Sequence, residues 1–313
     1  MPINVLFAVP DLWDDYKELL PAALTRAGVA DANVVPMGTD IPPDEIDYLV
    51  YAPTSPVQDF SPYTRVKLVQ NIWAGVERIV INPTLTQPLA RMVDPGLTES
   101  MVEWVVGNVL RHHLGLDRFT HNPERKWQIG PPPLARQRPV TILGLGELGT
   151  ACAAALTALN FPVTGWSRSP KTIAGITCLS GDDGLEKALS NAQILILLLP
   201  KTPQTENILN AERIARLPKG AMILNPGRGP LIDDEALIAA LDSGHVASAT
   251  LDVFRIEPLP TDHPYWDRPN VTVTPHIAAD TREATAVDVV AENIRRGEAG
   301  EPFLHRVDLA RGY

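Results

Sequence analysis

The architecture of this 313-residue chain can be predicted outward from Val140-Thr141-Ile142-Leu143-Gly144-Leu145-Gly146-Glu147-Leu148-Gly149. Four residues typical of a buried strand run directly into a G-x-G-x-x-G turn, and the small residues of 151–155 then predict a helix. Gly144 permits a tight turn, Gly146 lets the backbone approach a pyrophosphate, and Gly149 lets the helix pack against the strand. Because a helix N-terminus attracts phosphates, the turn favours a dinucleotide site over a plain glycine turn.

Strands and helices alternate on both sides of this turn. Apolar runs predict strands at 3–9, 46–51, 66–72, 140–143, 163–166, 194–198, 221–224, 247–251 and 271–274. Helical spacing of apolar residues predicts helices at 15–27, 98–114, 149–159, 234–242 and 281–296. Such alternation indicates an α/β fold with parallel sheets and right-handed crossovers.

Length and composition exclude several classes of protein. At roughly 150 residues per domain, the length suggests two domains. The formal net charge of −10, without a basic cluster, argues against binding to nucleic acid or anionic membranes. The apolar run 194–199 is too short to span a bilayer, and the first ten residues lack the basic region of a signal peptide. Since Cys152 and Cys178 provide neither a disulfide framework nor a zinc site, we expect a soluble, cytoplasmic protein without a metal.

The end of the predicted strand 163–166 bears on the choice of cofactor. An NAD site normally carries an acidic residue there, which binds the ribose 2′-hydroxyl. This chain has Ser167-Arg168-Ser169-Pro170-Lys171 instead, a segment that could also be an ordinary solvated loop. Ser167 has no charge to repel a 2′-phosphate, and Arg168, Ser169 and Lys171 could bind one. The sequence therefore predicts NADPH in preference to NADH.

Three further segments stand at the carboxyl ends of predicted parallel strands, the edge where ligands bind in open α/β sheets. They carry Arg228, Glu257 and His276. Each residue alone could be structural or solvated, but together they suit hydride chemistry on a 2-oxo acid. An arginine fork binds a carboxylate, a histidine donates a proton to the developing alkoxide, and a carboxylate keeps that histidine protonated.

The chain resembles the D-isomer-specific 2-hydroxyacid dehydrogenases over nearly its whole length. The resembling stretches are 73–77, 144–149, 198–205, 217–221, the Arg228 segment, 252–258 and His276. Within the family it is most similar to the branch that reduces glyoxylate and hydroxypyruvate, on the stretches 93–96, 165–171, 275–279 and 307–313. It departs from the family pattern at Glu77, where Asp is usual, and at Trp73, where smaller residues are common.

The resemblance implies a role for each matching residue. Arg228 would bind the carboxylate and 2-oxo group of the substrate, His276 would be the general acid/base, and Glu257 its partner. Backbone N–H groups of Ala74 and Gly75 would bind the carboxylate from the other domain. The implied cofactor contacts are Gly144, Gly146, Glu147, Leu148, Gly149, Ser167, Arg168, Ser169, Lys171, Leu199, Pro200, Thr205, Asn225, Pro226, Gly227, Asp252, Ala278 and Met101.

The resemblance also implies two Rossmann-like, doubly wound parallel-sheet domains. A discontinuous, flavodoxin-like substrate domain would consist of residues 1–108 and 282–313. The dinucleotide-binding domain would be 109–281, and the active site would lie in the cleft between the two domains. A homodimer is implied, with 111–138 as part of its arm and Trp127 reaching toward an active site.

The sequence thus favours an oxidoreductase that uses NADPH to reduce a small 2-oxo acid, of the glyoxylate or hydroxypyruvate type, to the 2-hydroxy acid. One alternative is a D-2-hydroxyacid dehydrogenase for a larger 2-oxo acid, and phosphite or formate dehydrogenase chemistry is favoured less. Another is a nucleotide-sensing protein of the corepressor type, which can retain the same three catalytic residues. Which 2-oxo acid is physiological, and whether Trp73 or Trp127 shapes the pocket, stay open.

Overall fold

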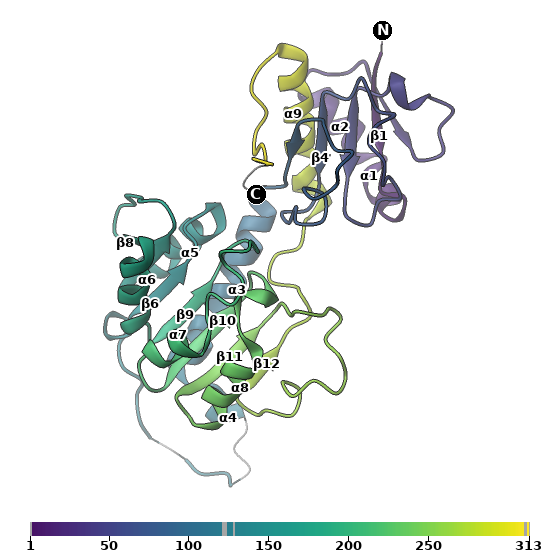
Figure 1. Cartoon of the computed structure of the whole chain (residues 1–313). Helices are drawn as coiled ribbons and strands as arrows, with labels where there is room; N and C mark the ends of the chain where they lie inside the picture. Colours follow the sequence, from purple (N-terminus) through teal and green to yellow (C-terminus); the bar gives the residue numbers. More distant parts are fainter. Residues whose placement is uncertain (1, 121–123, 128, 310–311, 313) are drawn as a thin grey trace. The chain divides into compact units, whose positions relative to one another are not determined.

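A computed structural model describes residues 2–120, 124–127, 129–309 and 312 (Figure 1). The chain divides into two compact units, one of residues 1–97 and 280–313 and the other of residues 98–279. The first division lies inside helix α3 (Pro95–Leu114), as does the boundary between residues 108 and 109 predicted from the sequence. The second division, at 279/280, lies two residues before the predicted boundary at 281/282.

The first unit is built on a five-stranded parallel sheet. Its strand order is β2 (Ala32–Pro36), β1 (Ile3–Phe7), β3 (Tyr48–Tyr51), β4 (Leu68–Asn71) and β5 (Leu89–Ala90). Helices α2 (Leu19–Arg26) and α9 (Glu283–Ala299) pack against each other beside the sheet (Figure 1). Their apolar residues share one buried core with those of β1 and β3. Because α9 comes from the end of the chain, this unit is discontinuous in sequence.

The second unit is built on a seven-stranded parallel sheet. Its strand order is β12 (Val271–Val273), β11 (Val246–Leu251), β10 (Ala221–Asn225), β9 (Ile194–Leu197), β6 (Val140–Leu143), β7 (Val163–Ser167) and β8 (Thr177–Ser180). After β8 the chain returns to the other side of β6 and continues outward from β9. Ligands of such sheets bind at the carboxyl ends of the strands around this switch point.

Helices cover both faces of this second sheet. One face carries α3 and α5 (Glu147–Ala158), and the other α6 (Gly181–Ser190), α7 (Ala211–Arg216) and α8 (Asp234–Asp242). Alternate residues of β9 belong to two different cores. Ile194 and Ile196 pack against α3 and α5, and Leu195 and Leu197 pack against α6, α7 and α8. A strand buried on both faces is expected to be continuously apolar, as this one is. The remaining short helices are α1 (Trp13–Tyr16), α4 (Asp117–Thr120), η1 (Pro10–Leu12), η2 (Pro43–Glu45), η3 (Ala135–Gln137) and η4 (Gly229–Leu231).

The predicted fold class is confirmed, since both sheets are parallel and the discontinuous unit has the flavodoxin-like strand order. The single helix predicted at 15–27 is wrong: α1 ends at Tyr16 and α2 begins at Leu19. The reason is Pro21, which has no N–H to donate to the carbonyl of Lys17. The elements β2, β5, β8, α6 and α7 were not predicted from the sequence. Along the described part of the chain, no helix combines the length and apolar character that a membrane span requires.

A buried histidine in α3 makes the stability of the second unit depend on pH. His112 is 7% exposed, and its Nε2 and Nδ1 contact Thr250 Oγ1 at 2.9 Å and Ser248 Oγ at 3.2 Å. Burial, helped by the charge of Arg111, lowers the pKa of His112 to about 4. At pH values between the ordinary pKa of histidine and about 4, His112 carries a proton in the unfolded chain but not in the folded protein. Stability is therefore lost as the pH falls through this window.

We expect His112→Gln to remove this part of the pH dependence. Relative to the variant, the wild type should lose about 2 kcal/mol of unfolding free energy between about pH 7.5 and pH 5. Urea unfolding of both proteins at the two pH values measures the difference. A difference that stays constant across this range would contradict the assignment.

Candidate active site

The glycine turn after β6 has a geometry that fits a pyrophosphate. Gly144 has φ +112°, and a Cβ there would lie 2.3 Å from the carbonyl oxygen of Leu198. A Cβ on Gly149 would lie 1.8 Å from the carbonyl oxygen of Gly144, so the start of α5 packs directly on the turn. A Cβ on Gly146 would meet no atom within 4 Å, and Gly146 caps α5 without a side-chain hydrogen bond. The first N–H groups of α5 therefore border open space, and no N-cap side chain accepts a hydrogen bond from them. Such groups can donate hydrogen bonds to a phosphate.

The polar segment after β7 lies beside this turn. Ser167 ends the strand, is 9% exposed, and donates its hydroxyl to the carbonyl of Ser169 at 2.9 Å. Lys171 donates its Nζ to the carbonyl of Leu145, inside the glycine turn. Arg168 and Ser169 are exposed at the end of the strand. The structure therefore brings the charge of Lys171 to the glycine turn, where the pyrophosphate is predicted to bind.

Two other predicted cofactor residues, Thr205 and Met101, contact neighbouring parts of the protein. Thr205 donates its hydroxyl to the carbonyl of Pro200 at 2.7 Å and accepts the N–H of Thr202 at 2.8 Å. Met101 is 4% exposed and packs with Ala278 in the core under α3. Their contacts with a cofactor, and those of Leu199, Pro200 and Ala278, stay predictions.

The turn that carries Arg228 is shaped by the buried side chain of Asn225. Asn225 Nδ2 donates to the carbonyl of Arg228 at 2.9 Å, and Asn225 Oδ1 accepts the N–H of Gly227 at 3.2 Å. A Cβ on Gly227 would lie 2.7 Å from the carbonyl oxygen of Leu197, so the turn is pressed against the end of β9. Arg228 Nη1 donates to the carbonyl of Gly227 at 2.7 Å. The roles predicted for Asn225, Pro226 and Gly227 toward a cofactor are not tested by these contacts.

The segment that carries His276 is held by Asp252, which is fully buried after β11. Its carboxylate accepts the hydroxyl of Thr274 at 2.5 Å and the N–H groups of Ile277 and Ala278 at 3.0 and 2.9 Å. Its backbone carbonyl accepts the N–H of His276 at 2.8 Å. His276 has φ +56°, a left-handed conformation that a residue other than glycine adopts at a cost. Such strain persists where surrounding contacts determine it, and it is common at functional sites.

Glu257 and His276 form the central pair of the site. Glu257 Oε2 lies 2.8 Å from His276 Nδ1, and Glu257 Oε1 accepts the N–H of Phe254 at 2.8 Å. The hydrogen bond to Glu257 raises the pKa of His276 above its ordinary value, against burial and the charge of Arg228 and with help from Asp252. Because Nδ1 is committed to Glu257, Nε2 is the nitrogen that can exchange a proton with a ligand.

The carboxylate of Glu257 stays ionised in this arrangement. Burial raises its pKa, but the hydrogen bonds from His276 and from the Phe254 N–H outweigh burial, and the charge of Arg228 adds to them. The net pKa of Glu257 is therefore below its ordinary value. Arg228, Glu257 and His276 follow the carboxyl ends of the adjacent parallel strands β10, β11 and β12, so the structure brings the three predicted catalytic residues to one edge of the sheet.

The predicted substrate residues of the first unit lie in a braced turn after β4. Asn71 Nδ2 donates to the carbonyls of Trp73 and Gly75, at 2.8 Å each. The substrate contacts of Ala74 and Gly75 stay predictions. Trp73 is 38% exposed and Trp127 is 92% exposed. Residues 121–123, 128, 310, 311 and 313, which belong to the predicted arm and the C-terminal motif, lie outside the described residues.

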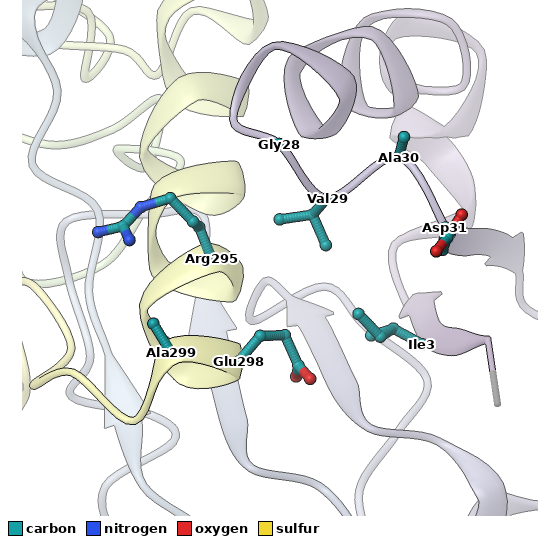
Figure 2. Close-up of a pocket in the computed structure, with 8 residues that line it drawn as sticks. All are labelled: Ile3, Gly28, Val29, Ala30, Asp31, Arg295, Glu298 and Ala299. Carbon is teal, nitrogen blue, oxygen red and sulfur yellow. The ribbon is translucent and has the colours of Figure 1, made fainter.

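Two hollows lie elsewhere and include none of the predicted site residues. Figure 2 shows the first, of about 360 Å³, between Gly28–Asp31 and the side chains of Arg295 and Glu298 on α9. Both side chains are already engaged, Arg295 with Glu292 and Glu301 and Glu298 with Tyr48 and Lys67. The second hollow, of about 290 Å³, lies near His112 at the amino ends of β10 and β11. Neither offers a set of converging groups suited to catalysis.

Sequence patterns did not identify the residues that position Glu257 and His276. Asp252 was predicted as a cofactor contact, which stays a prediction, and its carboxylate also binds the N–H groups of the His276 segment. Thr274 and the backbone N–H of Phe254 carried no motif of their own. A hydroxyl residue at a strand end, directly before Pro275 and His276, is the one signal that pointed to Thr274.

Comparison with known proteins gives consistent matches. The model of the D-isomer specific 2-hydroxyacid dehydrogenase NAD-binding domain matches residues 105–278. The glyoxylate/hydroxypyruvate reductase A of Yersinia enterocolitica serotype O:8 / biotype 1B is 38% identical to this chain over 319 residues. The match covers 99% of this chain and 100% of that protein.

Solved structures agree over the full chain. A D-isomer specific 2-hydroxyacid dehydrogenase from Xanthobacter autotrophicus Py2, in complex with NADPH and MES, has a TM-score of 0.92 and 40% identity and covers 100% of this chain and 99% of that one. An NADPH-dependent glyoxylate/hydroxypyruvate reductase from Sinorhizobium meliloti, in complex with NADP and sulfate, has a TM-score of 0.85 and 32% identity. That match covers 99% of this chain and 100% of the other.

Proposed function

This chain belongs to the D-isomer-specific 2-hydroxyacid dehydrogenase family, and on that premise we propose that it reduces a small 2-oxo acid to the 2-hydroxy acid with NADPH. As a member of the family it is an NAD(P)-dependent dehydrogenase. The hydrogen bond between Glu257 and His276, beside the charge of Arg228, is the observation that carries the proposed chemistry. The glyoxylate/hydroxypyruvate reductases among its relatives support a small substrate.

Each catalytic residue has one task in this proposal. The guanidinium of Arg228 binds the substrate carboxylate through a planar fork and orients the 2-oxo group. NADPH, when bound, supplies the hydride that reaches the carbonyl carbon. His276 donates the Nε2 proton to the oxygen as negative charge develops on it, and Glu257 stabilises the imidazolium before the transfer. Ala74 and Gly75 would offer backbone N–H groups to the carboxylate.

The residues proposed to hold NADPH fit that cofactor. Open space at Gly146 and the uncapped start of α5 suit the pyrophosphate. Ser167 places no carboxylate at the end of β7, and Arg168 and Lys171, which follow it in sequence, would supply positive charge for a 2′-phosphate. The solved relatives in complex with NADPH or NADP support this choice.

We also propose that the chain works as a cytoplasmic homodimer. Large apolar side chains are exposed along the predicted arm, with Trp127 92%, Ile129 89% and Phe119 45% exposed. Exposed apolar groups gathered in one segment are typical of surfaces that a partner covers. A second copy of this chain is the proposed partner.

The proposal predicts that the protein oxidises NADPH in the presence of glyoxylate or hydroxypyruvate. His276→Ala should lower kcat by roughly 10²–10⁴-fold, because general acid catalysis is lost, while NADPH affinity is unchanged. Loss of NADPH absorbance and the quenching of protein fluorescence by NADPH measure the two quantities. His245→Ala is the matched control, since His245 bonds the carbonyl of Ile214 away from the site. Turnover of larger 2-oxo acids alone, or tight NADPH binding without turnover, would contradict the proposal.

A second prediction concerns the pH profile. Reduction requires protonated His276, so activity should fall as the pH rises through the raised pKa of this residue. Glu257→Gln removes the main cause of the increase, and the loss of activity should then occur at lower pH. Steady-state kcat/KM across the pH range measures the shift, with the exposed Glu212→Gln on α7 as the control. An unmoved profile would refute the pairing of Glu257 with His276.

A third prediction concerns cofactor choice. Charged hydrogen bonds at a part-exposed 2′-phosphate, at about 2 kcal/mol in total, give NADPH at least a roughly tenfold higher kcat/KM than NADH. Arg168→Ala should remove most of this preference, and Ser167→Asp should shift it toward NADH by adding an acceptor for the ribose diol. Higher ionic strength should reduce it. Arg216→Ala, which alters the ion pair between Arg216 on α7 and Glu186 on α6, is the control. Equal kcat/KM for the two cofactors in the wild type would refute the prediction.

A further inference from the structure

One arginine joins three segments at the carboxyl edge of the second sheet. Arg255 Nη2 donates to the carbonyl of Ile232 at 2.5 Å and also to Asn207 Oδ1. Its Nε lies 3.3 Å from Asp234 Oδ2, and its Nη1 lies 3.7 Å from Glu206 Oε1. The guanidinium therefore reaches from its own loop to residues 206–207 and to residues 232–234.

These three segments continue directly into the proposed site. Residues 206–207 follow the cofactor segment that ends at Thr205, residues 232–234 follow Arg228 through η4, and Arg255 lies two residues before Glu257. The segments also touch through their backbones. The N–H of Asn207 donates to the carbonyl of Pro230 at 2.8 Å. The relative placement of Arg228 and Glu257 thus depends on how these segments pack.

The loop that carries Glu257 is anchored at its two ends, where Phe254 and Leu259 pack in the core of the second unit. Its backbone approaches η4 so closely that a Cβ on Gly229 would lie 2.0 Å from the carbonyl carbon of Phe254. Beyond Phe254 the loop is exposed, and Ile256 is 66% exposed. The carboxylate of Glu257 bonds the N–H of Phe254 and the imidazole of His276. Within the described residues 255–258, Arg255 is the side chain that ties the loop to residues 206–207 and 232–234.

We propose that Arg255 is a positioning residue for the reaction: by holding these three segments in one arrangement, it keeps Glu257 within hydrogen-bond reach of His276 and aligned with Arg228. The inference rests on the proposed function for the identity of the reaction. The geometry of the contacts does not depend on that identity. Part-exposed ion pairs contribute little to global stability, so the effect should appear in the chemistry rather than in Tm.

The test compares Arg255→Ala and Arg255→Lys with a matched control. Arg268→Ala is suitable, because Arg268 also binds a carboxylate, that of Asp242, and a carbonyl, that of Pro264, in the same unit. For Arg255→Ala we expect kcat for the 2-oxo acid to fall roughly ten- to a hundredfold, with a Tm change no larger than in the control. Arg255→Lys should recover part of the rate, since the ammonium can still pair with Asp234.

A second measurement does not require turnover. The pKa of His276, which Glu257, Arg228 and Asp252 face, can be followed by NMR titration of its imidazole in the cofactor-free protein. We expect it to fall toward the ordinary histidine value in Arg255→Ala and to stay at the wild-type value in Arg268→Ala. If Arg255→Ala fails to fold, Asn207→Gly removes one acceptor at a residue with φ +51°, and the pKa should move in the same direction.

The outcomes separate this inference from the proposed function. An imidazole pKa that depends on Arg255, in a wild type that reduces no 2-oxo acid, supports the positioning role and overturns the proposed substrate. An unchanged pKa in Arg255→Ala overturns the positioning role whatever the substrate. A decrease in kcat no greater than that of Arg268→Ala, in an enzyme that reduces 2-oxo acids, also overturns it.

Discussion

The buried carboxylate of Asp252 is the constraint on which the Glu257–His276 pair depends. A charge withdrawn from water is costly unless hydrogen-bond donors surround it, and here the donors are the hydroxyl of Thr274 and the N–H groups of Ile277 and Ala278. All three belong to the segment around His276. Satisfying the carboxylate therefore requires this segment to adopt one geometry, in which His276 is left-handed. That conformation directs Nδ1 to Glu257, so a buried charge on one strand end determines the orientation of the imidazole on the next.

The same edge of the sheet is assembled by close contacts between backbones. A Cβ at Gly144, Gly227 or Gly229 would lie between 2.0 and 2.7 Å from a neighbouring backbone atom. Side chains are excluded at these three positions, and the turns that follow parallel strands therefore pack on one another. Polar side chains such as Arg228 stand directly beside these glycines. Parallel topology brings the turns to one edge, and glycine lets them touch there.

Sequence patterns predicted those parts of the molecule that depend on local chemistry. The strand β6 and the helix α8 have the predicted bounds, because apolar and β-branched residues mark the strand and helical spacing of apolar residues marks the helix. Half-exposed elements such as β8 were missed, since their residues T-C-L-S carry no periodic signal. The residues proposed to be catalytic were predicted from motifs. The contacts of Asp252 and Arg255 were not predicted, because they depend on which loops meet in space. A sequence pattern does not contain that information.

The electrostatics of the site follow from a conflict that Glu257 resolves. The charge of Arg228, which the proposed reaction needs for substrate binding, lowers the proton affinity of His276, and burial acts in the same direction. The reduction nevertheless needs His276 protonated, so an ionised Glu257 must lie in direct contact with it, as it does at 2.8 Å. A substrate carboxylate bound to Arg228 would neutralise that opposing charge. Substrate binding would then raise the proton affinity of His276 further, and the proton would be held most firmly when the 2-oxo acid is in place to receive it.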